Sequence, residues 1–269
     1  AATNSAGKLP KGLRRLLFFP VQRSFGHHFT AFVSGGAPLD RDVFEFWSSM
    51  GFTVLEGYGL TETSPVLCVN TMERQLAGSV GPPLPGVELK IEGKELLVRG
   101  DNVFQGYYEN EPASRAAFTE DGWFRTGDLG EIGPDGWLRI KGREKDLIVT
   151  GAGVNVSPDE LETVLNRIAG VKEACVIGVD RGRGEEVHAV LLLDESGTAP
   201  EGIIAEANSE LDTLQQITGY TVWNEPEFPR TTTLKIKKFE VRNMIEQGLQ
   251  KGTASVVQDR LLNLLAQLT

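Results

Sequence analysis

Short apolar runs separated by glycine- and proline-containing turns occupy the first part of the chain. Residues 31–40, AFVSGGAPLD, indicate a buried strand that ends in a Gly-Gly-Ala-Pro turn. Residues 40–51 have an aspartate cap, apolar side chains at helical spacing and a closing glycine, so they predict a helix. Residues 52–60 indicate another short strand that runs into a glycine-containing loop. Strand, helix and strand in this order are typical of a parallel α/β layer.

The pattern of apolar residues changes near residue 78. Short strands separated by turn residues are predicted within 78–91, 94–100, 122–132 and 136–143. Asp-Gly pairs at 121–122 and 135–136 are typical of hairpin turns. This region therefore predicts a small antiparallel sheet package, a β-barrel-like subdomain.

A second change near residue 145 indicates a differently built domain. Residues 157–168 place Ser157 at the N-cap and Pro158 at the first helical position, with apolar residues on one face, which predicts a helix. Residues 171–180 and 187–195 are apolar enough to be buried strands, and residues 203–214 indicate another helix. We place the boundary in the charged segment 143–146 and predict a small α+β domain beyond it.

Composition and charge narrow the possible functions. The chain has 269 residues and a formal net charge of −10, which disfavours a nucleic-acid partner. Cys68 and Cys175 lie far apart in apolar surroundings and indicate reduced core thiols rather than a disulfide or a metal site. No apolar run reaches the roughly 18 residues of a transmembrane segment, and LLFF is too short for an export signal, so we expect a cytoplasmic protein. Residues 11–26 favour a helix that covers a core, with a peripheral membrane segment as the alternative.

Several motifs carry groups that suit a nucleotide. In YGLTET, Gly59 gives a turn, Thr61 offers a hydroxyl group for phosphate and Glu62 offers a carboxylate for Mg²⁺. Asp128 in RTGD and Arg143 in GREKD are candidate ligands for a ribose or a phosphate. Each motif by itself is equally typical of a turn, a helix cap or a charged linker. The same holds for the glycine-rich TGAGVNVSP and for the cationic KIKK.

The order of the motifs is more specific than any one of them. Over residues 26–242 the chain reads GGAPL, YGLTET, ELLVRG, GYYENE, GWFRTGDLG, GREKDLI, GAGVNVSPDELE and PRTTTLKIKK. In this order the motifs resemble the adenylate-forming superfamily, which includes acyl-CoA synthetases, luciferases and the adenylation domains of peptide synthetases. The chain looks most like the C-terminal half of a medium- or long-chain fatty acid–CoA ligase.

The resemblance implies a division of the chain into four parts. Residues 1–77 would be the end of the large N-terminal domain, an α/β layer with adenine and phosphate motifs, and residues 78–143 its β-barrel-like subdomain. Residues 144–242 would be a small, mobile α+β C-terminal domain. Residues 243–269 would be a linker and an apolar-periodic helix. That helix resembles the opening helix of an acyl carrier domain, or it docks on the small domain as a terminal helix.

The resemblance also implies a role for each matched residue. The catalytic residues would be Lys235, Thr61 and Glu62, with Glu62 also associated with Mg²⁺. Lys145 would be the hinge of the small domain, and a loop containing Gly151 and Gly153 would meet the tunnel of the thiol. The nucleotide-binding residues would be Gly35, Gly36, Ala37, Pro38, Tyr58, Gly59, Thr61, Asp128 and Arg143.

The implied function is ATP- and Mg²⁺-dependent formation of an acyl-adenylate from a carboxylic acid, a fatty acid by resemblance. The acyl group would then pass to a thiol of CoA or of a phosphopantetheine arm, with an acyl carrier domain as a possible partner. One alternative is an amino- or aryl-acid adenylation domain that loads a carrier protein. A second alternative is a non-catalytic nucleotide-binding or interaction module.

Two departures from the family pattern affect these expectations. The Ser/Thr/Gly-rich loop that ends in a lysine and cradles the ATP phosphates in the family is not found in this sequence. We therefore expect the chain to be inactive by itself. Leu234 stands where many relatives carry glycine before the catalytic lysine, so Lys237 and Lys238 remain alternatives to Lys235.

Overall fold

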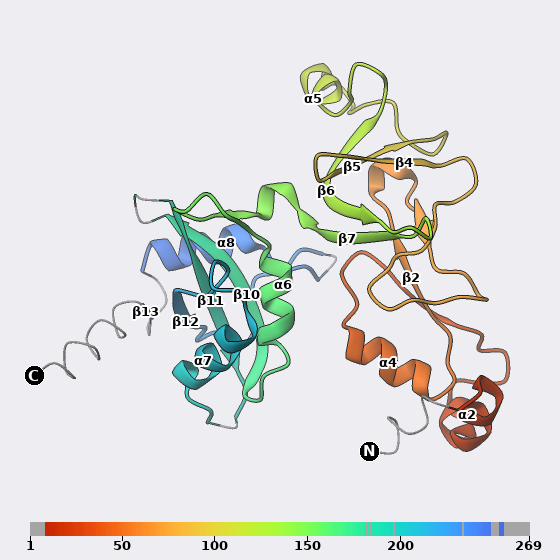
Figure 1. Ribbon diagram of the computed structural model, residues 1–269, viewed down its shortest axis with the longest axis horizontal. Coiled ribbons are helices and arrows are strands. Elements are labelled where there is room, and N and C mark those ends of the chain that lie inside the picture. Colours follow the sequence, from red (N-terminus) through yellow and green to blue (C-terminus); the bar gives the residue numbers. More distant parts are fainter. Residues whose placement is uncertain are drawn as a thin grey trace, which may run out of the picture. The chain divides into compact units, whose positions relative to one another are not determined.

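The computed structural model describes residues 9–180, 182, 184–195, 197–232, 234–248 and 253–255. The chain divides into two compact units, Ala1–Lys141 (unit 1) and Gly142–Thr269 (unit 2). Several small sheets alternate with helices in the described residues of both units (Figure 1), which confirms the predicted mixture of α/β and α+β structure. The division after Lys141 lies two residues before the predicted boundary between 143 and 144.

The first sheet of unit 1 has the predicted strand–helix–strand order. Strand β1 (Phe32–Ser34) pairs in parallel with β2 (Val54–Tyr58), and α4 (Arg41–Ser49) connects them. The Asp40 carboxylate accepts a hydrogen bond of 2.7 Å from the Asp42 amide and thereby caps α4. Strand β3 (Cys68–Val69) pairs antiparallel with the end of β2 and completes the sheet.

The amino-terminal segment forms two short helices, where the sequence indicated one. Helix α2 (Lys11–Leu17) ends at Phe18, and α3 (Phe19–Ser24) begins directly after it. Pro20 in the first turn of α3 has no amide proton to donate, and its ring disfavours a helical residue before it. The Lys11 ammonium donates to the Thr53 hydroxyl over 2.6 Å, so this segment is tied to the rest of unit 1.

The second sheet of unit 1 is antiparallel, with the strand order β4 (Glu88–Glu92), β5 (Glu95–Arg99), β6 (Phe124–Ile132) and β7 (Leu138–Arg143). Helix α5 (Glu111–Ala116) lies between β5 and β6 in sequence. The described strands form the predicted antiparallel sheet package, and this sheet is open and not a closed barrel. Leu138 in β7 pairs with Gly81 of the preceding loop and not with β4. Four short strands are too few to close a barrel around a packed interior.

The two sheets of unit 1 share one hydrophobic core. Leu67 and Cys68 from the first sheet region pack with residues of the second, namely Leu96, Val98, Phe124 and Leu138. Residue 77 therefore separates two sheets and not two compact units. Both cysteines are free and buried, as the sequence indicated, and burial raises the pKa of the Cys68 thiol to about 12.

A buried acid in β2 gives unit 1 a pH-dependent stability. Burial raises the pKa of the Glu56 carboxyl group to about 7, although its oxygen accepts a hydrogen bond from the Gly78 amide. Between about pH 4.5 and 7 the unfolded chain releases this proton first, so the folded state loses stability as the pH rises and carries the full penalty above pH 7. We expect Glu56→Gln, which keeps an oxygen acceptor for Gly78, to stabilise unit 1 at pH 8 by about 1–2 kcal/mol, allowing for solvent screening.

Urea unfolding of both proteins at pH 4.5 and pH 8 tests this expectation. The two free energies of unfolding should be nearly equal at pH 4.5 and should diverge with rising pH. A wild-type protein that gains stability relative to Glu56→Gln as the pH rises would contradict the sign of the effect.

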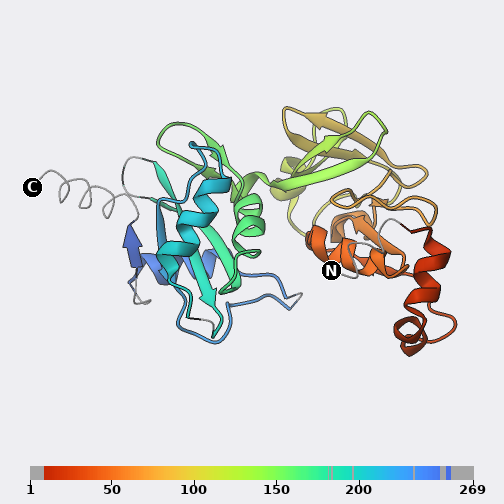
Figure 2. The ribbon, with the colours of Figure 1, turned by 60° about the horizontal axis from the view of Figure 1, so that its bottom comes forward.

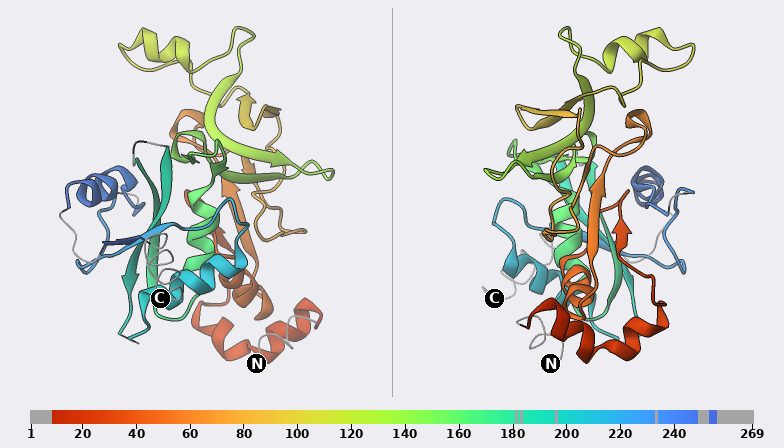
Figure 3. Two further views of the ribbon diagram at one scale, coloured as in Figure 1. Left: turned by 60° about the vertical axis from the view of Figure 1, so that its left-hand side comes forward. Right: turned by 90° about the vertical axis from the view of Figure 1, so that its right-hand side faces the viewer.

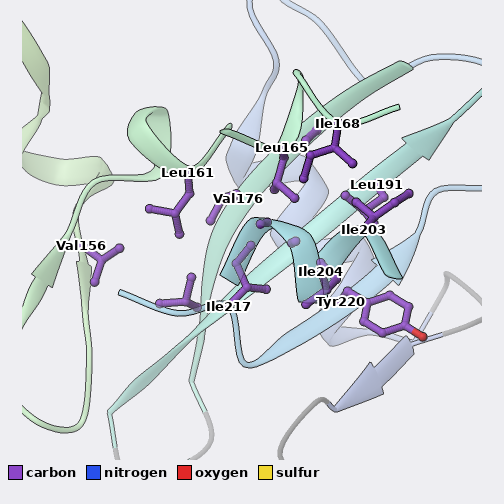
Figure 4. Close-up of a cluster of buried hydrophobic side chains, with 14 of the residues drawn as sticks. Val156, Leu161, Leu165, Ile168, Val176, Leu191, Ile203, Ile204, Ile217 and Tyr220 are labelled. Carbon is purple, nitrogen blue, oxygen red and sulfur yellow. The ribbon is translucent and has the colours of Figure 1, made fainter. Parts of the chain in front are cut away.

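Unit 2 is a four-stranded sheet covered by helices on both faces. Its strand order is β10 (Val171–Asp180), β11 (Glu185–Leu193), β12 (Gly219–Val222) and β13 (Thr253–Ser255). Helices α6 (Pro158–Leu165) and α7 (Pro200–Glu210) lie on one face, and α8 (Lys238–Glu246) lies on the other (Figures 2 and 3). Figure 4 shows the side chains that fill the core between α6, α7 and the sheet.

Several features of unit 2 differ from the patterns read in the sequence. Helix α7 begins three residues earlier than predicted because Pro200 starts it, and it ends after Glu210. The Asn208 side chain bonds both backbone groups of Ile217 and so fixes the return of the chain toward β12. Strand β12 and helix α8 were not predicted.

The described part of the segment 243–269 belongs to these elements. Helix α8 continues to Glu246, and β13 pairs antiparallel with β12. The predicted terminal helix through Val256, Val257, Leu261 and Leu264 lies outside the described residues. No helix in the described ranges is long and apolar enough to cross a bilayer.

Candidate functional site

The candidate adenine-binding turn lies at one end of the parallel strand pair of unit 1. Gly35, Gly36, Ala37 and Pro38 follow β1 and are exposed. A Cβ atom on Gly35 would lie 3.2 Å from the Gly57 carbonyl oxygen of β2, so glycine allows the turn to run close to the neighbouring strand. The carboxyl ends of parallel strands are where open α/β sheets bind their ligands.

Two predicted nucleotide-binding residues are joined by a hydrogen bond. The Tyr58 hydroxyl group donates to Oδ2 of Asp128 over 2.5 Å, across 70 positions of sequence. Tyr58 ends β2, whereas Asp128 lies in β6 of the second sheet with only 4% of its surface exposed. The structure thus joins the Tyr58 phenol group to a buried carboxylate from the other sheet of unit 1.

Asp128 lies on an irregular segment of β6. The register with β5 passes from Leu97↔Arg125 to Glu95↔Leu129, so more residues of β6 than of β5 occupy this stretch. The Glu95 carboxylate of β5 stabilises this segment: it accepts hydrogen bonds from the Gly127 amide over 3.2 Å and from the Arg125 guanidinium group over 2.8 Å. This irregularity gives the RTGD motif its fixed position.

The turn that carries Thr61 and Glu62 is a single turn of 3-10 helix, η1 (Thr61–Thr63). It follows Gly59, where a Cβ atom would lie 1.9 Å from the Pro65 carbonyl oxygen, so no other residue fits there without a shift of the backbone. The turn is held from outside by Asn102, whose amide group donates to the carbonyl oxygens of Thr63 and Val66 over 2.9 and 3.0 Å.

The hydroxyl group of Thr61 is exposed, whereas Glu62 has a protein partner. Tyr107 donates its hydroxyl proton to Oε1 of Glu62 over 3.2 Å. Burial and the negative charge of Glu62 both raise the pKa of Tyr107, which therefore stays a donor. The remaining lone pairs of Glu62 suit Mg²⁺ as a single carboxylate ligand beside phosphate oxygens, and no group of three or more His, Cys, Asp or Glu side chains that could hold a metal occurs among the described residues.

The predicted catalytic lysine of unit 2 lies on a tight loop before α8. The Thr231 amide donates to the Lys235 carbonyl oxygen over 2.8 Å, and Arg230 and Ile236 form a bridge below the loop. Lys235 is exposed, and its ammonium group has no hydrogen-bond or ion-pair partner among the described residues. An exposed, unpaired cation is free to meet a phosphate.

The two alternative lysines are engaged elsewhere. Lys237 pairs with Glu240 over 2.8 Å. Lys238 lies between Asp159 at 3.2 Å and Glu162 at 2.9 Å, and these carboxylates raise its pKa despite burial, so it stays charged and anchors α8 to α6. These contacts favour Lys235 over both alternatives.

The remaining predicted residues lie around the start of unit 2. Arg143 is the last residue of β7, and Lys145 is exposed in the short η2 (Glu144–Asp146) that follows. Gly151 and Gly153 are exposed in the loop between β8 (Ile148–Val149) and β9 (Asn155–Val156). The structure thus divides the predicted site residues between the two units.

The sequence did not indicate the residues that form hydrogen bonds to the motif residues and so support their positions. These are Glu95, Asn102, Tyr107 and Arg230, which bind backbone or side-chain atoms of the motif residues. Glu95, Tyr107 and Arg230 lie within matched motifs, and this position could have marked them as candidate residues. No pattern in the sequence indicated which atoms they would bind. Partners far apart in sequence are fixed only by the fold.

The fold and the motifs define a class of protein with an α/β unit that carries the candidate nucleotide motifs, followed in the chain by an α+β unit with an exposed lysine. Comparisons with known proteins agree. Residues 5–108 match the family model of AMP-binding enzymes. The resemblance to the C-terminal part of the adenylate-forming superfamily is therefore confirmed.

Several of the curated relatives that the chain matches are named as fatty acid ligases. It is 46% identical over 165 residues to the long-chain-fatty-acid–CoA ligase FadD15 of Mycobacterium bovis, covering 61% of this chain and 27% of that protein. It is 36% identical over 192 residues to the long-chain-fatty-acid–[acyl-carrier-protein] ligase AEE15 of Arabidopsis thaliana, covering 63% of this chain and 26% of that protein. The chain thus spans about a quarter of the length of these two relatives.

Solved structures show the same fold. ATP-bound MatB from Rhodopseudomonas palustris matches with a TM-score of 0.73 and 34% identity, over 80% of this chain and 45% of that one. The o-succinylbenzoate CoA synthetase MenE of Bacillus subtilis, in complex with AMP, matches with a TM-score of 0.73 and 27% identity, over 84% of this chain and 53% of that one.

Proposed function

We propose that this chain is the C-terminal part of an ATP-dependent acid–thiol ligase of the fatty acid–CoA ligase type. The complete protein would form a fatty acyl-adenylate and pass the acyl group to a thiol of CoA or of a phosphopantetheine arm. The observation that supports this most directly is the Tyr58–Asp128 hydrogen bond, which joins two residues for base and ribose beside the turn of Thr61 and Glu62. The fatty acid ligases among the relatives favour a fatty acid substrate.

Each residue has a physical role in the first step. The carboxylate of the acid attacks the α-phosphorus of ATP, and pyrophosphate leaves, so negative charge develops on the phosphoryl oxygens. Lys235 supplies a point charge and Thr61 a hydroxyl donor to these oxygens. Asp128 holds the ribose hydroxyl groups and Tyr58 packs on the base. Glu62 would hold Mg²⁺, which neutralises phosphate charge when it is bound.

The second step needs a different arrangement around the same adenylate. The thiol gives up its proton to water, its sulfur forms a bond to the acyl carbon, and the bond from that carbon to the phosphate oxygen breaks, so AMP leaves with the bonding electrons. Since Lys235 and the loop of Gly151 and Gly153 both belong to unit 2, we propose that rotation about Lys145 exchanges one for the other. Arg143 would assist Asp128 at the ribose in one of the two arrangements.

A pyrophosphate-exchange assay of the complete natural protein tests the proposed function. We expect exchange with decanoate or palmitate that depends on ATP and Mg²⁺, and exchange with benzoate or amino acids at least about tenfold slower, since an apolar pocket discriminates by about 1–3 kcal/mol. This 269-residue chain by itself should show no exchange. Absence of exchange with every acid would favour a non-catalytic nucleotide-binding or interaction module.

One second candidate has a specific observation in its favour. The solved structures similar to this chain include MenE, named for o-succinylbenzoate, an aryl acid. An aryl- or amino-acid adenylation domain is therefore the alternative, and faster exchange with benzoate or an amino acid than with the fatty acids would support it. A carrier as the thiol acceptor is distinguished by replacing CoA with a phosphopantetheinylated carrier protein in the complete reaction.

A further inference from the structure

We infer that Arg230 and Glu173 form a positioning pair that sets the orientation of the Lys235 loop for acyl-adenylate formation. The inference rests on the proposed function of Lys235. Neither Arg230 nor Glu173 contacts the reacting groups, and their role is to keep Lys235 in position on an exposed loop. All the contacts that carry it lie among described residues of unit 2.

Three hydrogen bonds connect the described residues of the Lys235 loop to one another. The Thr231 amide donates to the Lys235 carbonyl oxygen over 2.8 Å, the Leu234 amide donates to the Thr231 carbonyl oxygen over 3.0 Å, and the Lys235 amide donates to the Thr231 hydroxyl group over 3.2 Å. Leu234 and Lys235 are exposed, and Leu234 has 73% of its surface in solvent. Apolar burial at the tip therefore contributes little to its order.

The backbone at the tip adopts a conformation that an L-residue disfavours. Leu234 has a φ angle of +64°, in the left-handed region that glycine enters at no cost. A non-glycine residue persists there only when its surroundings hold it. The residue directly before Lys235 therefore needs an external contact to keep its conformation.

Arg230 supplies that contact. One guanidinium nitrogen donates to the Leu234 carbonyl oxygen over 2.8 Å, directly at the peptide bond that leads into Lys235. Another nitrogen of the same group donates to the Glu173 carboxylate over 2.5 Å. The planar guanidinium group can make both bonds at once because its donors diverge from one rigid centre.

Glu173 attaches the loop to the sheet of unit 2. It lies in β10, a ten-residue edge strand that pairs with β11, and the register between the two strands shifts between Val171 and Glu173. The side chains of Glu173 and Arg230 are each only 27% exposed, so solvent screens their interaction less than it screens the ion pairs at the surface. Two side-chain hydrogen bonds, from Arg230 to Glu173 and from Arg230 to the Leu234 carbonyl oxygen, thus connect β10 to the peptide bond that precedes Lys235.

The test uses the complete natural protein and measures its two half-reactions separately. Pyrophosphate exchange reports acyl-adenylate formation, and thioester formation from supplied palmitoyl-adenylate and CoA reports the second step. Arg230→Gln should lower the rate of exchange by about 10–100-fold, because a misplacement of about 1 Å in a catalytic group has that effect. The thioester step, in which Lys235 takes no part, should stay within about twofold.

Conservative variants and a matched control separate positioning from folding. Arg230→Lys keeps the charge but cannot bridge two acceptors in one plane, so we expect a smaller loss of exchange, about 3–10-fold. The control is Arg242→Gln, which removes the Arg242–Glu185 ion pair, a pair of comparable exposure in the same unit that includes no residue of the Lys235 loop. Its exchange rate and the melting temperature of both glutamine variants should stay close to wild type.

The outcomes distinguish this inference from the proposed function beneath it. A selective loss of exchange in Arg230→Gln supports the inference. Exchange in Arg230→Gln at the level of Arg242→Gln, or an equal fall of both half-reactions with a lower melting temperature, overturns it while Lys235→Ala still loses exchange. If wild type forms no adenylate, or Lys235→Ala retains full exchange, the proposed function fails and the inference fails with it.

Discussion

Replacing Lys235 by alanine in the complete protein is expected to lower the rate of acyl-adenylate formation by about 10²–10³-fold, equivalent to about 2.7–4 kcal/mol of transition-state stabilisation. The reason is that negative charge builds on the phosphoryl oxygens as pyrophosphate leaves, and Lys235 carries an exposed cation with no partner among the described residues. The effect should appear in kcat for exchange, because the interaction strengthens only as the charge develops.

The neighbouring lysine provides the control for this prediction. Lys237→Ala removes the same charge two residues away, but the ammonium group of Lys237 is paired with Glu240. We expect its exchange rate to remain within about twofold of wild type, since an exposed ion pair contributes at most about 1 kcal/mol. A protein that keeps its exchange rate in Lys235→Ala and loses it in Lys237→Ala would move the catalytic role to Lys237.

Gly59→Ala is expected to destabilise unit 1 by about 3 kcal/mol or more and to disrupt the turn of Thr61 and Glu62. The added Cβ atom would lie 1.9 Å from the carbonyl oxygen and 2.8 Å from the carbonyl carbon of Pro65, and both atoms belong to the backbone. A flexible side chain could rotate away, whereas this contact requires the loop itself to move. Because Tyr58 directly precedes Gly59, we expect such a shift also to disturb the Tyr58–Asp128 hydrogen bond.

The same substitution elsewhere in unit 1 gives a matched control. Gly12 lies in α2, and a Cβ atom there would meet nothing within 4 Å. Gly12→Ala should leave stability unchanged or raise it by up to about 1 kcal/mol, because alanine favours helix more than glycine does. Urea unfolding of the 269-residue chain, followed by tryptophan fluorescence, measures both variants. Equal stability of the two would show that the Gly59 turn relaxes at no cost.

The elements that the sequence determined correctly are those that depend on short-range patterns. The parallel pair of β1 and β2 with α4 between them follows from apolar periodicity, the Asp40 cap and the glycine turns. Strand β10 spans the predicted residues 171–180, where the apolar run from Ala174 to Val179 is buried although β10 is an edge strand of the described sheet. The order of the motifs likewise indicated the family that the comparisons confirmed.

Only the tertiary structure decided how the motif residues are held. Tyr58 and Asp128 are 70 positions apart, and Arg230 and Glu173 are 57 apart, so no local pattern encodes either pair. The tertiary structure also decided that Leu138 of β7 forms an antiparallel bridge with Gly81 and not with β4, which leaves the second sheet open. Periodicity and caps report the conformation of a few neighbouring residues, whereas contacts between distant residues arise when the whole core packs and fixes the distances between its elements.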